Sequence, residues 1–178
     1  MYFFLFHIKF DLNVPSNSSA LYRKDASNAG AEALQAGFVH LDSAQMYKNE
    51  VSLGKAISQY NDRSKLFITS KLDHIPEGES IRDTVVRTCK ELHVDYLDLF
   101  LIHTPKILSG LTIPEVWIQL EELKREGLAK SIGVSNFRVY DLEQLLPSAK
   151  IIPAVNQVRI YLPPDHPLYS YVFIPPKD

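Results

Sequence analysis

Four residues whose side chains can donate, accept or stabilise a proton stand at the ends of strand-like runs in this sequence. Asp42 ends the run 37–42, and Tyr47 follows it by five positions. Lys71 and His103 each close a later strand-like run. In a barrel of parallel strands, the chemistry is carried by residues at the carboxyl ends of several different strands. The sequence therefore predicts that these four side chains form one catalytic group.

Apolar, β-branched runs separated by helix-like segments are expected to position this group. The runs start about 30 residues apart, which is the length of a strand with its crossover helix. Several are apolar on both faces, as in a parallel sheet that is covered on both sides. The predicted strands cover residues 38–42, 66–72, 96–103, 129–135 and 153–160.

The segments between the strands carry helix signals. Ser80 with Asp83, and Thr112 with Glu115, match the capping box of a helix N-terminus. Trp117, in the second of these helices, is expected to pack in the core. Apolar stripes at helical spacing follow the caps, at Ile81, Val85, Cys89 and Leu92 and at Val116, Leu120 and Leu123. The pattern predicts an α/β fold of repeated strand–helix units.

Composition narrows the class of protein. With 46% hydrophobic residues and a formal net charge of -2 over 178 residues, the chain is expected to form one soluble core and to bind neither nucleic acid nor a membrane. Its start, residues 1–7, lacks the basic residues and cleavage site of a signal peptide, so we expect a cytoplasmic protein. The single Cys89 fits a reducing compartment, and no ligand spacing predicts a metal.

Five motifs together resemble one known family. They are residues 37–44 with Tyr47, Asn49 and Glu50, then residues 68–71, 95–103, 127–137 and 155–157. In this order, from about residue 21 to residue 157, they resemble the aldo-keto reductase family, especially its small fungal members. The resemblance implies a (β/α)8 TIM-barrel fold that binds NADPH and reduces small-molecule aldehydes or ketones by direct hydride transfer.

The resemblance also implies a role for each catalytic candidate. Tyr47 would be the general acid, Lys71 and Asp42 its electrostatic partners, and His103 the group that orients the substrate carbonyl. Hydride addition leaves negative charge on the carbonyl oxygen, and tyrosine can supply the proton. Because an unperturbed tyrosine has a pKa of about 10, we expect the Lys71 ammonium to lower the pKa of Tyr47, with Asp42 keeping the lysine charged.

On the cofactor side, Ser135, Asn136 and Gln157 match family positions that hold the nicotinamide carboxamide. Structural alternatives stay open for these residues and for the catalytic ones. Ser135 and Asn136 could form a turn and a helix N-cap instead. Asp42 could cap a helix, Lys71 could pair on the rim, and His103 could be structural.

The two ends of the chain depart from the family. Residues 1–20 form a divergent segment, residues 21–160 a partial barrel, and residues 161–178 a proline-rich tail. The sequence after Gln157 matches neither of the last two family strands, and it lacks the basic cluster expected to hold the cofactor phosphates. We therefore expect a barrel truncated to five or six units, with weak NADPH binding.

Two classes of function stay open at this point. One is an NADPH-dependent reductase that retains some or no activity. The other is a catalytically silent chain that acts as a regulatory subunit, or a truncated product without function. An open barrel edge would also favour self-association of the chain.

Overall fold

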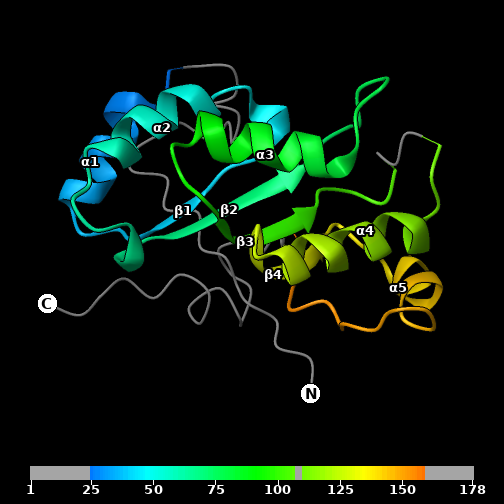
Figure 1. Ribbon diagram of the computed structural model, residues 1–178. Coiled ribbons are helices and arrows are strands. Elements are labelled where there is room, and N and C mark those ends of the chain that lie inside the picture. The colour runs from blue at the N-terminus through cyan, green and yellow to red at the C-terminus, as the bar shows by residue number, and fades with distance from the viewer. Residues whose placement is uncertain (1–24, 107–109, 159–178) are drawn as a thin grey trace, which may run out of the picture.

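The computed structural model describes residues 25–106 and 110–158, which form one parallel sheet with helices packed against it (Figure 1). The sheet has five strands in the order β1-β2-β3-β4-β5, and each strand pairs in parallel with the next strand along the chain. All carboxyl ends therefore lie at one edge of the sheet. The strands are β1 (His40–Asp42), β2 (Phe67–Leu72), β3 (Leu97–Ile102), β4 (Ala129–Ser135) and β5 (Asn156–Gln157).

Within the described residues, four of the five α-helices and two short 3-10 helices lie between these strands, and the first α-helix precedes β1. In Figure 1, α1 to α3 lie above the strands, and α4 and α5 lie at the lower right, along the outer side of the curled sheet. This is the arrangement expected when every crossover packs back on the same face. The helices are α1 (Ser27–Gln35), α2 (Glu50–Ser58), α3 (Ile81–Glu91), α4 (Ile113–Glu126) and α5 (Val139–Leu145), with η1 (Gln45–Tyr47) and η2 (Arg63–Lys65).

Local signals explain where two of the helices begin and end. The predicted capping boxes are both present, because Ser80 pairs reciprocally with Asp83 before α3 and Thr112 with Glu115 before α4. Gly127 ends α4 with a φ of 82°, a left-handed conformation that favours glycine. The capping predictions are confirmed.

The core lies between the helices and the sheet. All members of both predicted helix stripes are buried, including Cys89, which is 5% exposed. Trp117 is 1% exposed, and its indole Nε1 donates to the carbonyl oxygen of Ile151 at 3.0 Å. Its predicted role in core packing is therefore confirmed. No helix in residues 25–106 or 110–158 has the length and apolar character needed to cross a membrane.

The last predicted strand, residues 153–160, begins later in the structure than expected. Among the described residues, its regular pairing covers Asn156–Gln157, although the preceding residues already run along β4. Its predicted end, at residues 159 and 160, lies outside the described part of the chain. Ala154 N donates to Ile132 O, and Val134 N donates to Val155 O, both at 2.9 Å. Pro153 has no N–H for a ladder, which explains the late start. Residues 1–20 and the tail 161–178 lie outside the described part of the chain.

Candidate active site

Asp42 and Lys71 form a buried ion pair at the carboxyl ends of β1 and β2. The Lys71 Nζ donates to Asp42 Oδ1 and, at 2.9 Å, to the carbonyl oxygen of Ser43. The side chains of Lys71 and Asp42 are only 2% and 6% exposed. A charged lysine is costly to bury unless it is paired and hydrogen-bonded, and here it is both. The alternative of a surface ion pair on the rim is therefore wrong.

Tyr47 is placed beside this pair by a short turn. The chain leaves β1 and forms η1, in which Tyr47 N donates to Ala44 O at 2.8 Å, and Lys48 ends the turn with a φ of 54°. The Lys71 Nζ lies 5.4 Å from the centroid of the Tyr47 ring. The turn thus brings the phenol to the ion pair although Tyr47 is five positions beyond the strand.

The pKa of Tyr47 is raised to about 12. Burial is the main cause, because it disfavours the phenolate, and the negative charge of Asp42 adds to the shift. This direction is opposite to the predicted lowering by Lys71, because burial and the charge of Asp42 both raise the pKa of Tyr47. The phenol of Tyr47 consequently keeps its proton at neutral pH, which is the form required of a general acid.

His103 follows β3 directly and is 9% exposed. Its ring meets that of Tyr47 edge-on, with the ring centroids 5.8 Å apart and the planes at 83°. Its backbone is held on both sides, because His103 N donates to Leu72 O at 3.3 Å and His103 O accepts from Asn136 Nδ2 at 2.9 Å. These bonds hold the backbone of His103 at the end of β3, where its ring lies next to the phenol of Tyr47.

The three predicted cofactor residues meet at the ends of β4 and β5. Ser135 Oγ donates to Gln157 O at 2.7 Å, and Asn136 N donates to the same oxygen at 3.0 Å. Asn136 adopts a φ of 59°, so the turn interpretation is correct for this residue. The N-cap of α5 is Arg138, so neither Ser135 nor Asn136 caps that helix.

Contacts between neighbouring residues join all predicted site residues into one closed circle. Lys71 pairs with Asp42, and Asp42 Oδ2 accepts from Gln157 Nε2 at 2.7 Å. Gln157 contacts Ser135, whose hydroxyl accepts from Asn136 Nδ2 at 3.1 Å. Asn136 Nδ2 then donates to His103 O, and the His103 ring contacts the Tyr47 ring edge-on. The Tyr47 ring lies beside Lys71 Nζ. The sequence prediction of a shared edge thus agrees with the geometry.

The residues present suit a carboxamide ligand on one side of this circle. Ser135, Asn136 and Gln157 supply a hydroxyl and two primary amides, which can donate and accept toward a group that itself does both. Among the described residues, no group of three or more His, Cys, Asp or Glu side chains is arranged to hold a metal ion.

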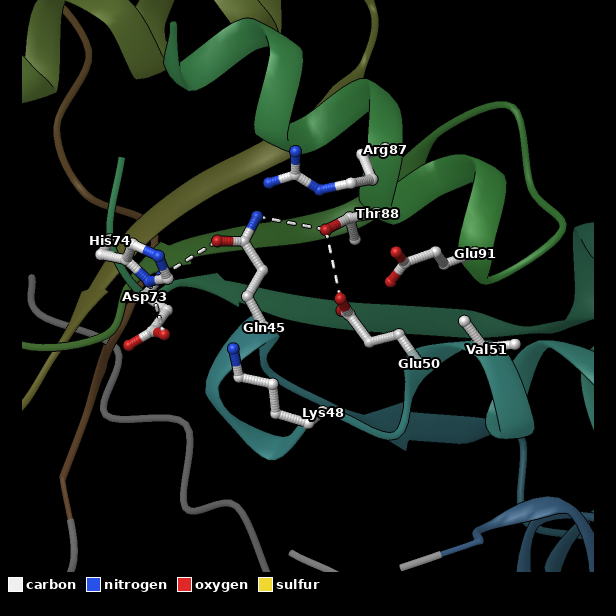
Figure 2. Close-up of a pocket in the computed structure, with 9 residues that line it drawn as sticks. All are labelled: Gln45, Lys48, Glu50, Val51, Asp73, His74, Arg87, Thr88 and Glu91. Carbon is white, nitrogen blue, oxygen red and sulfur yellow. Dashed lines mark hydrogen bonds and ion pairs between the residues drawn. The ribbon is translucent and has the colours of Figure 1, made fainter. Parts of the chain in front are cut away.

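Glu50 is a buried polar residue whose function the sequence did not reveal. It is the first residue of α2 and is 4% exposed. In the sequence it was recognised only as part of the family motif that contains Tyr47. It lines a cavity of about 260 Å³, which Figure 2 shows between the turn η1 and helix α3. The cavity is lined by Gln45, Lys48, Glu50, Val51, Asp73, His74, Arg87, Thr88 and Glu91, and by none of the predicted site residues.

Comparisons with known proteins agree with this fold and site. The NAD/NADP-dependent indole-3-acetaldehyde reductase of Schizosaccharomyces pombe is 44% identical over 132 residues, which cover 72% of this chain and 46% of that protein. The NADPH-dependent alpha-keto amide reductase of Saccharomyces cerevisiae is 39% identical over 128 residues, covering 69% of this chain and 41% of that protein. The chain thus spans about half the length of the curated relatives it matches.

A crystal structure of an aldo/keto reductase from Brucella melitensis superimposes with a TM-score of 0.69 and 42% identity, covering 76% of this chain and 53% of that chain. The curled parallel sheet and its helices therefore correspond to part of a (β/α)8 barrel, as the sequence predicted. The model of the Aldo/keto reductase family matches residues 13–167. By fold, by sequence match and by the relatives that share both, the chain belongs to the aldo/keto reductase family.

Proposed function

We propose that this chain carries the catalytic residues of an NADPH-dependent reductase that converts small aldehydes or ketones to alcohols. The observation that carries the proposal is the closed circle in which Tyr47 lies beside both the Lys71–Asp42 pair and His103. The two yeast relatives, an indole-3-acetaldehyde reductase and an alpha-keto amide reductase, support the same reaction class.

Each catalytic side chain has a role that follows from its position. Tyr47, protonated at neutral pH, donates its proton to the oxygen that gains negative charge. The Lys71 ammonium stabilises that negative charge, and Asp42 holds the ammonium in place and keeps it charged. The His103 ring, fixed edge-on to the phenol, positions the carbonyl oxygen. Bound NADPH supplies the hydride.

Ser135, Asn136 and Gln157 are proposed to hold the carboxamide of the nicotinamide ring. A primary amide has two N–H donors and one carbonyl acceptor, so the single bond from Gln157 Nε2 to Asp42 leaves this side chain able to bind a ligand. Asn136 is exposed, so its side chain is accessible to a ligand.

No observation favours the alternative of a catalytically silent subunit, since the four catalytic candidates are all present and in contact. A cytoplasmic location and self-association through an open sheet edge stay predictions. In the described part of the chain, β1 and β5 each pair with a single strand.

The proposal is tested by following NADPH oxidation with indole-3-acetaldehyde and with an alpha-keto amide as substrates. We expect turnover by the 178-residue chain and its loss in Tyr47→Phe, by about 10²- to 10⁴-fold. Tyr140→Phe is the matched control, because Tyr140 is 70% exposed on α5. If Tyr47→Phe turns over substrate as fast as the unaltered chain, Tyr47 is not part of the mechanism. If the unaltered chain shows neither turnover nor saturable NADPH binding, the proposed function is refuted.

A further inference from the structure

Glu50 touches the segment that carries Lys71. Its Oε1 accepts a hydrogen bond from Ser70 Oγ at 2.6 Å, and Ser70 immediately precedes Lys71 in β2. Ser70 is fully buried and Glu50 nearly so. Hydrogen bonds from hydroxyls to a buried carboxylate are short and strong, so this contact ties the start of α2 to the end of β2.

The second carboxylate oxygen of Glu50 leads to the turn that carries Tyr47. Glu50 Oε2 accepts from Thr88 Oγ1 at 3.2 Å, and Thr88 Oγ1 accepts from Gln45 Nε2 at 3.1 Å. The Gln45 Oε1 in turn accepts from the backbone N–H of Asp73 at 3.0 Å. Figure 2 shows Gln45 and Glu50 reaching the Thr88 hydroxyl from opposite sides. Since Gln45 begins η1 and Tyr47 ends it, the relay holds one end of the catalytic turn.

Several charged groups surround the Glu50 carboxyl. Burial raises its pKa to about 7, against the lowering effect of the Ser70 hydrogen bond, and the charge of Glu91 raises it further. The Thr88 hydrogen bond and the charge of Lys71 lower it. Titratable groups from three elements lie near it. Helix α3 supplies Arg87, Cys89 and Glu91, and β2 with the residues after it supplies Lys71, Asp73 and His74. Lys48 comes from the end of η1. Arg87 is paired with Glu79 and His74 with Asp73.

We propose that Glu50 is a positioning residue that holds Lys71 and the Tyr47 turn in their catalytic arrangement through Ser70 and Thr88. The inference rests on the proposed function for the part that concerns catalysis. As a carboxylate, Glu50 accepts from both hydroxyls, and Thr88 can then accept from Gln45. As a carboxylic acid, Glu50 has one O–H that can donate to Ser70 or to Thr88, and the hydrogen bond to that hydroxyl is then reversed. The arrangement in the structure, in which both hydroxyls donate to Glu50, is therefore favoured when Glu50 is ionised.

The first test follows the backbone amide of Asp73 by NMR, because its hydrogen bond ends the relay. In the unaltered chain we expect its chemical shift to titrate with a midpoint near neutral pH. Glu50→Gln should abolish this titration. Thr88→Val, which breaks the relay but leaves Ser70 in contact with Glu50, should abolish it too. Glu91→Gln is the matched control on the same cavity wall, and it should keep the titration with a lower midpoint.

The second test measures turnover in the same variants. Glu50→Gln should lower kcat about tenfold at pH above the titration midpoint, which is the effect of losing roughly one hydrogen bond to the catalytic turn, while KM changes little. An Asp73 shift that titrates equally in Glu50→Gln or Thr88→Val would overturn the relay. If the unaltered chain is active and Glu50→Gln has the same kcat at every pH, the positioning role of Glu50 is overturned. A chain with no turnover but the expected NMR titration would instead count against the proposed function alone.

Discussion

The side-chain amide of Gln157 donates a hydrogen bond of 2.7 Å to the carboxylate of Asp42, across 115 positions of sequence. It joins β5 to β1, the two outer strands of the described sheet, over their carboxyl ends. The other oxygen of Asp42 accepts from Lys71. One carboxylate therefore connects a proposed cofactor residue to the ion pair beside Tyr47, so a ligand bound at Gln157 would also act on the environment of Lys71.

Replacing Gln157 by alanine should weaken NADPH binding by about tenfold, which corresponds to roughly one hydrogen bond. Fluorescence titration of NADPH measures this change. Gln144→Ala, an exposed glutamine on α5, is the control and should bind like the unaltered chain. Equal dissociation constants for the two variants would exclude Gln157 from the cofactor site.

Removing only the lysine of the buried pair should destabilise the fold. In Lys71→Met the Asp42 carboxylate loses its ammonium partner while it stays buried, and breaking a buried pair in this way typically costs about 3 to 5 kcal/mol. Adding Asp42→Asn should recover part of that stability because no unpaired charge remains, although activity stays absent. Chemical denaturation measures both effects. A double variant that is less stable than Lys71→Met would contradict this account of the pair.

The titration of Glu50 should make folding stability depend on pH. Its pKa rises from 4.5 to about 7 on folding, so between these values the folded state binds more protons than the unfolded state. The free energy of unfolding should therefore decrease as pH rises from about 4.5 to 7, by roughly 3 kcal/mol in total, and level off above that range.

Glu50→Gln should lack this decrease, and denaturation at a series of pH values tests it. Glu122→Gln serves as control, since the Glu122 side chain is 58% exposed on α4 and should leave the pH profile unchanged. A parallel decrease in Glu50→Gln would assign the effect to another group.

Tyr47 should ionise only at high pH. Because its pKa is raised to about 12, its phenolate absorbance should appear at a pH well above that at which an exposed tyrosine ionises. The difference between alkaline ultraviolet titrations of the unaltered chain and of Tyr47→Phe isolates this one phenol. A Tyr47 midpoint at or below about 10, the ordinary value, would mean that the Lys71 charge outweighs burial and Asp42.

Local pattern was sufficient to predict most of the secondary structure. The caps at Ser80 and Thr112 and the apolar stripe from Ile81 to Leu92 depend on residues three or four positions apart, so they can be recognised without knowing the rest of the fold. The start of the last strand was harder to predict, because regular pairing after Pro153 depends on which backbone groups β4 presents to it.

The position of the site was also predictable from sequence, but its energetics were not. Parallel strands bring their carboxyl ends to one edge, so Asp42, Lys71 and His103 had to lie near one another once the strands were recognised. The raised pKa of Tyr47, the Gln157–Asp42 bond and the Glu50 relay depend on burial and on distances between side chains far apart in sequence. Only the tertiary structure determines those quantities, because desolvation and hydrogen bonding act between neighbours in space.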